Sequence, residues 1–168
     1  MSGLKILSLF TALTLVAACS STSDQIGSSS SYGSSSGTSG VDTGTVSTKP
    51  AGTQEDLVVN AGDRVRFGYD SFELSADARG VLERQAAWLQ SNGSVNVLIE
   101  GHCDERGTRE YNLALGDRRA SAAKNYLVAL GIADSRISTI SYGKERPIAF
   151  GSIAADWAIN RRGVTVVK

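Results

Sequence analysis

Hydrophobic residues from about residue 57 to the C-terminus alternate between the two-residue period of a β-strand and the 3.6-residue period of an α-helix, and this alternation limits the possible folds most strongly. Strand patterns cover residues 64–69, 95–99, 137–142 and 164–167. Helical spacing predicts helices over 75–92, from about 110 to 131, and, as a short element, over 153–159. We therefore expect an α/β fold (an α+β sandwich) of order β-α-β-α-β-β, with a mixed sheet and the helices packed on one face.

The composition changes sharply just before this region. Of the 30 residues 20–49, 22 are Ser, Thr or Gly, so this segment has almost no apolar surface to bury. Such a segment cannot offset the entropy lost on ordering, which predicts a flexible tether over residues 19–56. The 168 residues suit one ordinary domain plus extensions, and we place that domain at residues 57–168.

The N-terminus has the pattern of an export signal. A single early charge, Lys5, precedes an uncharged and mostly apolar run over residues 6–18, which is too short to span a ~30 Å hydrocarbon core. Residues 1–18 are therefore expected to be a signal peptide. The end of this run, Val16-Ala17-Ala18-Cys19, resembles a bacterial lipobox, which implies that Cys19 is acylated and that Ser20 directs delivery to the outer membrane. An ordinary secretory signal cleaved nearby is the alternative.

Charge and cysteine content exclude two classes. The 17 basic and 17 acidic side chains cancel, so the net charge favours neither nucleic acid nor an anionic surface, and we expect no nucleic-acid partner. The chain has two cysteines. If Cys19 carries lipid, Cys103 has no intramolecular partner, which excludes a disulfide framework.

Residues 101–120, GHCDERGTREYNLALGDRRA, gather the only histidine of the chain with a cysteine, four acids and four arginines. The segment leaves the second predicted strand, crosses a glycine-bounded loop and enters the second long helix. Strand ends beside helix N-termini are common places for ligand sites in α/β proteins. This segment is therefore the candidate functional site.

Metal binding and catalysis are the weaker interpretations of this segment. His102, Cys103, Asp104 and Glu105 are all possible metal ligands, but adjacent residues rarely converge on one tetrahedral centre and no second His or Cys cluster exists. A nucleophilic Cys103 beside His102 would also need an orienting group and an oxyanion site, and neighbours in an extended segment point to opposite sides. We therefore expect no metal, no cofactor and no catalytic residue.

Binding of a zwitterionic ligand requires fewer precisely placed groups than metal binding or catalysis does. A carboxylate can meet an ammonium group and a guanidinium can meet a carboxylate, and Asp104 in the loop and Arg119 on the helix supply both charges. Asn112 lies seven residues before Arg119, hence on the same helix face. The alternative is that Asp104, Arg106, Arg109 and Arg119 merely pair with one another on a solvated surface, and the residues alone do not decide between the two.

A family resemblance bears on this choice. Residues 101–112, GHCDERGTREYN, and 115–120, LGDRRA, resemble the signature of the peptidoglycan-associated lipoproteins within the OmpA-like domain family. The resemblance extends from about Phe67 to Val167 and includes FGYD at 67–70, SYGKERP at 141–147 and NRR at 160–162. It therefore covers the whole predicted domain.

The resemblance implies non-covalent binding of the peptidoglycan stem peptide through meso-diaminopimelate. The ligand-binding aspartate and arginine of the family fall on Asp104 and Arg119, while Asp70 and Asn112 lie at positions that border the pocket. It further implies an outer-membrane lipoprotein of the Tol–Pal system, lipid-anchored with its domain facing the periplasm, acting in envelope integrity and cell division. TolB and other Tol proteins are the implied protein partners. A peptidoglycan hydrolase and a pure adaptor for Tol proteins are the alternative functions.

Two departures from the family pattern stand out, and one assignment stays structural. Cys103 replaces a residue that is usually small, which could place a thiol near the pocket. Residues 151–156, GSIAAD, replace a more polar segment and bear on partner specificity. We interpret Arg161 and Arg162 as structural pairs near the last strand and not as ligand contacts.

Overall fold

The structure is a computed structural model that describes residues 50–168. The expected signal peptide at residues 1–18, the lipidation site Cys19 and the tether up to residue 49 lie outside the described residues. Those three expectations therefore remain predictions.

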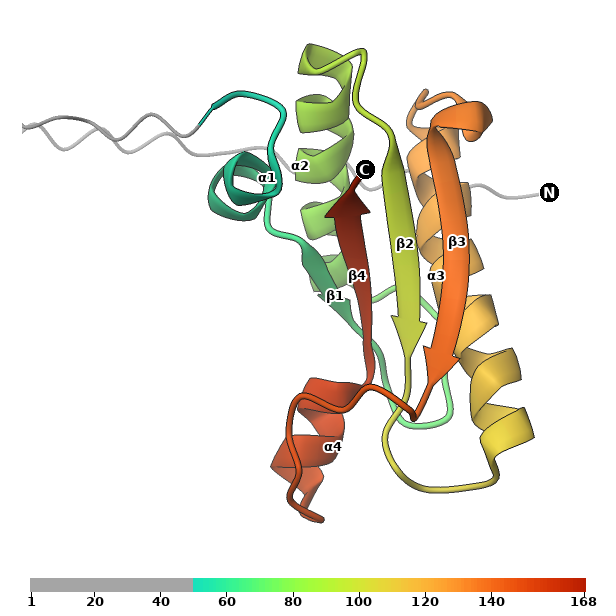
Figure 1. The fold of residues 1–168 in the computed structure, drawn as a ribbon. Helices are drawn as coiled ribbons and strands as arrows, with labels where there is room; N and C mark the ends of the chain where they lie inside the picture. The colour runs from blue at the N-terminus through green and yellow to red at the C-terminus, as the bar shows by residue number, and fades with distance from the viewer. Residues whose placement is uncertain (1–49) are drawn as a thin grey trace, which may run out of the picture. The chain divides into compact units, whose positions relative to one another are not determined.

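A four-stranded mixed sheet forms the centre of the fold (Figure 1). The strands are β1 (Arg64–Arg66), β2 (Val97–His102), β3 (Ile137–Gly143) and β4 (Arg162–Val167), and they lie in the order β1-β4-β2-β3. Strand β4 runs antiparallel to both β1 and β2, whereas β2 and β3 are parallel. The parallel pair is joined by a helix, as a crossover between parallel strands requires.

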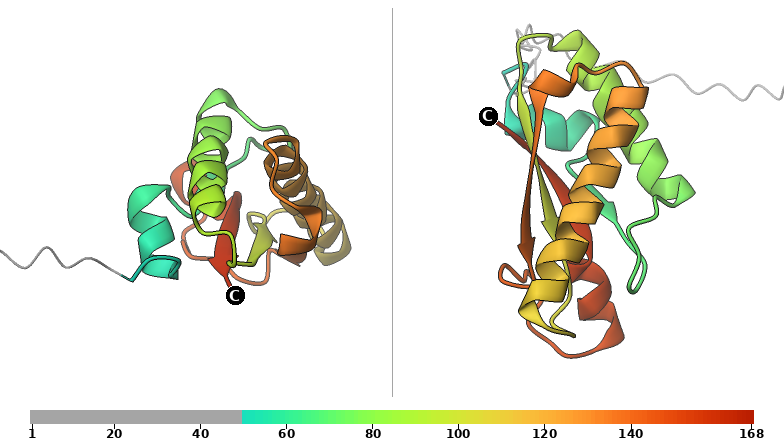
Figure 2. Two further views of the ribbon diagram at one scale, coloured as in Figure 1. Left: turned by 90° about the horizontal axis from the view of Figure 1, so that it is seen from above. Right: turned by 90° about the vertical axis from the view of Figure 1, so that its right-hand side faces the viewer.

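Two long helices pack on one face of this sheet, as the sequence predicts. They are α2 (Ala76–Ser91) and α3 (Arg109–Ala129), and Figure 2 shows both on the same side of the strands. Ser75 caps α2 by accepting a hydrogen bond from the backbone of Ala78, as its place before the helical pattern indicates. The core between the layers is apolar and includes Leu82, Leu89, Val97, Ile99 and Leu127. Burial of this shared face holds the helices on the sheet.

Helix α3 approaches β2 closely because two glycines meet at their crossing. A Cβ built on Gly101 would overlap the carbonyl oxygen of Gly116, and a Cβ on Gly116 would overlap the hydroxyl of Ser141. Any side chain at Gly101 would therefore meet backbone, and one at Gly116 would displace the Ser141 hydroxyl. This contact brings the beginning of α3 over the end of β2, where the candidate site lies.

The folded part begins earlier than the expected boundary at Leu57. Helix α1 spans Gln54–Asn60 and is capped by Thr53, whose side chain accepts from the backbone of Asp56. Leu57 is fully buried in the core, and the indole of Trp88 donates to the Asp56 carboxylate at 2.8 Å. Residues 54–56, which we assigned to the tether, therefore belong to a helix that packs on the domain. The seven residues of α1 are too few for a repeating helical pattern of apolar residues, so the sequence did not predict this helix.

Three shorter features complete the order. The first strand is shorter than predicted, since only residues 64–66 pair with β4. A 3₁₀-helix, η1 (Asp134–Arg136), precedes β3, and α4 (Ala154–Asn160) precedes β4 close to the expected position.

Within residues 50–168, no helix combines the length and apolar character needed to cross a membrane.

Candidate ligand-binding site

A cavity of about 120 Å³ opens where β2 gives way to the loop that leads into α3. The four residues expected to bind or border the ligand, Asp70, Asp104, Asn112 and Arg119, all line it. They come from the β1–α2 loop, the β2–α3 loop and α3. The structure therefore brings together residues that lie up to 49 positions apart in the sequence. The remaining lining residues are Tyr69, Cys103, Arg106, Gly107, Tyr111, Leu115 and Arg161.

The β2–α3 loop owes its shape to one buried amide. Asn112 donates from Nδ2 to the carbonyl oxygens of Arg106 and Thr108, at 2.8 and 3.0 Å. Gly107 adopts a φ of 88°, which favours glycine, and Thr108 caps α3 by accepting from the backbone of Tyr111. Asn112 thus borders the cavity as expected, and its amide group fixes the loop that carries Asp104.

Asp104 is nearly buried and pairs with two arginines. Arg106 donates to its carboxylate from Nε at 3.2 Å and from Nη2 at 2.7 Å, and Arg161 donates from Nη1 at 3.1 Å. Burial by itself would raise the pKa of Asp104, but the hydrogen bonds from the two guanidinium groups outweigh it and lower the pKa. Asp104 is therefore a carboxylate at neutral pH, held in place by its own chain.

Arg119 has no exposed surface, and backbone carbonyls take up most of its donors. Its guanidinium donates to Ser71 O at 2.8 Å, to His102 O at 2.8 Å and to Gly68 O at 3.0 Å, and Nη1 also contacts Cys103 Sγ at 3.3 Å. Burial lowers its pKa, and among residues 50–168 it makes no ion pair with a carboxylate. Of the five N–H groups of Arg119, three donate to carbonyls and one contacts Cys103 Sγ, so one Nη2 N–H has no hydrogen-bond partner among residues 50–168, in a side chain that lines the cavity.

Asp70 stands at the mouth of the cavity in a left-handed backbone conformation, with a φ of 49°. Its carboxylate accepts a hydrogen bond from the hydroxyl of Tyr111 on α3, and this contact raises the pKa of Tyr111. The pair joins the β1–α2 loop to the first turn of α3. Asp70 is exposed, so solvent reaches it from outside the cavity.

His102 and Cys103 point in different directions, as neighbours in an extended segment should. Cys103 faces α3, where its thiol donates to the carbonyl of Asn112, and burial raises its pKa. His102 packs against Tyr142 with ring centroids 5.5 Å apart, and burial lowers its pKa to about 4, helped by Arg162 and Arg146. Residues 50–168 contain no cluster of His, Cys, Asp or Glu suited to a metal.

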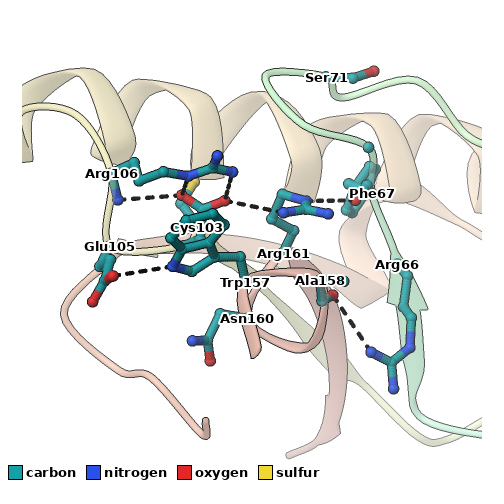
Figure 3. Close-up of polar contacts among 12 residues, drawn as sticks. Arg66, Phe67, Ser71, Cys103, Glu105, Arg106, Trp157, Ala158, Asn160 and Arg161 are labelled. Atoms are coloured by element: carbon teal, nitrogen blue, oxygen red, sulfur yellow. Dashed lines mark hydrogen bonds and ion pairs between the residues drawn. The ribbon is translucent and has the colours of Figure 1, made fainter. Parts of the chain in front are cut away.

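Sequence reasoning missed part of this site. Arg161 does form a structural pair, as expected, but the carboxylate it pairs with is Asp104 and its side chain lines the cavity. Arg106 lies between the rings of Tyr69 and Trp157, with its guanidinium carbon 4.2 and 4.1 Å from the ring centroids. Figure 3 shows Arg106, Arg161 and Trp157 gathered beside the β2–α3 loop. These residues are present in the sequence, but no spacing rule predicts that a residue of α4 contacts the loop that follows β2.

The alternative of mutual pairing among the four charged residues holds for only one pair, Asp104 with Arg106. Asp104 pairs with Arg106, but Arg109 pairs with Glu145 at 3.3 Å on the surface, and Arg119 is buried. Three guanidinium groups and two carboxylates line the cavity. The site therefore has an excess of positive charge together with one buried carboxylate, a combination suited to a ligand that carries both charges.

Comparisons with known proteins agree with this fold. The OmpA family model matches residues 66–161. A peptidoglycan-associated lipoprotein from Rhizobium meliloti is 53% identical over 116 residues, which is 69% of this chain and 66% of that protein. A protein of the same name from Mesorhizobium japonicum is 53% identical over 117 residues, which is 70% of each chain. The match thus covers about two thirds of these relatives.

Solved structures show the same architecture. The peptidoglycan-associated lipoprotein from Burkholderia pseudomallei is 42% identical and superposes with a TM-score of 0.62, covering 63% of this chain and 90% of that one. The C-terminal domain of Helicobacter pylori MotB has a TM-score of 0.59 at 23% identity, covering 63% and 84% of the two chains, which shows the fold alone. The chain belongs to the OmpA family and, within it, to the peptidoglycan-associated lipoproteins.

Proposed function

We propose that this protein binds peptidoglycan without cleaving it, by gripping the meso-diaminopimelate residue of a stem peptide in the cavity beside α3. The observation that carries the proposal is that a buried guanidinium, Arg119, and a buried carboxylate, Asp104, line the same cavity. The side-chain end of diaminopimelate carries an ammonium and a carboxylate. Asp104 would accept the ammonium, and the free Nη2 N–H of Arg119 would meet the carboxylate.

Asp70 and Asn112 would support this grip in different ways. Asn112 fixes the β2–α3 loop, and Asp70 with Tyr111 forms the rim through which the stem peptide enters. The small cavity has room for the charged end of one residue and not for a whole peptide. Most of the polymer would then lie outside, which suits reversible attachment to a large network.

The N-terminal pattern and the names of the relatives extend the proposal to the whole chain. Acyl chains on Cys19 would hold the protein in the outer membrane, since each buried methylene contributes about 0.8 kcal/mol. A tether of this composition would have a root-mean-square reach of roughly 30 to 35 Å, enough to separate the domain from its membrane. The protein would thereby anchor the outer membrane to the cell wall, facing the periplasm as a member of the Tol–Pal system with TolB as partner.

Sedimentation with purified sacculi tests the binding function. We expect the purified full chain to pellet with sacculi and to release no soluble fragments. Asp104→Asn should pellet much less, whereas Asp117→Asn, which changes an exposed acid on α3, should behave as the parent chain. Released muropeptides would identify a hydrolase. Failure of the parent chain to pellet would favour a pure adaptor for Tol proteins.

A further inference from the structure

The carboxylate of Asp104 has no unused acceptor position. Oδ1 accepts from the backbone N and from Nε of Arg106, both at 3.2 Å. Oδ2 accepts from Nη2 of Arg106 at 2.7 Å and from Nη1 of Arg161 at 3.1 Å. A carboxylate offers about four lone-pair positions, so a ligand ammonium reaches Asp104 only if one of these donors leaves.

Of the two arginines, Arg106 is the one free to leave. Arg161 is 14% exposed and is tied a second time, from Nε to the carbonyl of Phe67 at 3.1 Å. The Arg106 side chain is 35% exposed, and its only hydrogen bonds among residues 50–168 go to Asp104. Its bidentate pair is therefore the weaker barrier to an incoming cation, because solvent screens it on one side.

In the absence of ligand, two aromatic rings hold the Arg106 side chain against Asp104. Tyr69 comes from the β1–α2 loop and Trp157 from α4, and the guanidinium lies between them. The indole of Trp157 donates to the Glu105 carboxylate at 3.0 Å, which fixes the ring beside the loop (Figure 3). Contacts between a cation and an aromatic face are weak at sites that solvent reaches. The stack thus favours the closed arrangement without locking it.

From this geometry we propose that Arg106 is an internal occupant of the site, a guanidinium that fills the position on Asp104 which a ligand ammonium must take. Binding is then an exchange in which the ligand displaces Arg106 from the carboxylate. This inference rests on the proposed function, because it concerns the same pocket and the same ligand. It assigns Arg106 a specificity role: a ligand without a cationic group gains nothing from Asp104 and leaves Arg106 in place.

Removal of the occupant should strengthen binding. We expect Arg106→Gln in the full chain to bind a meso-diaminopimelate stem tripeptide roughly three- to tenfold more tightly than the parent chain in calorimetric titration, since the ligand no longer competes with a partly exposed ion pair. Arg106→Lys, which lacks the bidentate fork, should fall between the two. Arg109→Ala removes an exposed arginine that pairs with Glu145 on the surface, and it should bind as the parent chain does.

A second measurement follows the exchange itself. The chain has two tryptophans, and Trp88 is buried in the core, so a ligand-induced change in fluorescence reports mainly on Trp157. We expect the parent chain to show this change and Arg106→Gln to bind without it. Weaker or unchanged binding by a folded Arg106→Gln chain would overturn the inference while leaving the proposed function intact. Absence of binding by the parent chain would overturn both.

Discussion

Arg119 on α3 donates a hydrogen bond from Nε to the carbonyl oxygen of Ser71, 2.8 Å away in the β1–α2 loop. The same guanidinium reaches the carbonyls of Gly68 and His102, so one buried side chain connects the helix, the first loop and the end of β2. A residue expected to contact ligand is thus also a central structural link. Its substitution therefore tests the fold as well as the site.

Replacing Arg119 by lysine should destabilise the protein strongly. A lysine cannot satisfy three carbonyls arranged around a planar fork, and each buried acceptor left unpaired costs about 1 to 3 kcal/mol. We expect Arg119→Lys to lower the free energy of unfolding by about 2 to 4 kcal/mol in urea denaturation. Arg118→Lys, the exposed neighbour, should change it by less than about 0.5 kcal/mol. Equal stabilities of the two variants would contradict the bracing role.

The glycine contact between β2 and α3 gives a second prediction. A methyl group on Gly101 would overlap the backbone of Gly116, and backbone cannot move aside as a flexible side chain can. We expect Gly101→Ala to lower the free energy of unfolding by at least about 3 kcal/mol. Gly93→Ala is the matched control, since a Cβ there meets no atom within 4 Å. Thermal unfolding of both variants measures the difference, and a tolerant Gly101 would show that the helix does not need this close approach.

The single histidine predicts a specific pH dependence of stability. His102 is neutral in the folded state, with its pKa lowered from 6.5 to about 4 by burial and by Arg162, Arg146 and Arg64. Between these values the unfolded chain binds a proton that the folded chain does not, so the free energy of unfolding falls as the pH is lowered. From pH 6.5 to pH 5 the expected loss is about 1.5 kcal/mol.

Urea denaturation across this pH range tests the assignment to His102. Glu100, 3.4 Å from Nε2, is the carboxylate next to the ring, and Nδ1 is the one buried side-chain polar atom of residues 50–168 that has no hydrogen-bond partner. In His102→Gln the loss between pH 6.5 and 5 should largely disappear, whatever the absolute stability of the variant. A loss of the same size in His102→Gln would assign the effect to other groups.

Local patterns were enough to predict most of the fold. The helical spacing over 75–92 and the alternation at 95–99 gave α2 and β2 because a buried face repeats with the period of its element. Helix α1 could not be predicted, because Leu57 is its only buried residue and a single buried residue produces no helical period. The edge position of β1 beside β4 could not be predicted either, because it depends on pairing between residues about 100 positions apart.

The candidate site was predictable in its members and not in its connections. Asp104 and Arg119 were identified from charge, helix position and family resemblance, and the structure places both on one cavity. Their partners could not be predicted from the sequence. Arg161 contacts Asp104 from 57 residues away, and Arg119 donates to backbone carbonyls, which every residue type carries. Side-chain chemistry predicts which groups can bind a ligand, whereas tertiary packing decides which of them already bind each other.

Calorimetric titration of the full chain with a meso-diaminopimelate stem tripeptide tests the central claim most directly. Asp104→Asn keeps the shape of the side chain but removes the charge that would meet the ligand ammonium, at an expected cost of about 1.5 to 3 kcal/mol, or roughly 10- to 150-fold in affinity. Asp117→Asn should bind as the parent chain does. A folded Asp104→Asn chain with unchanged affinity would contradict the assignment of this cavity as the peptidoglycan site.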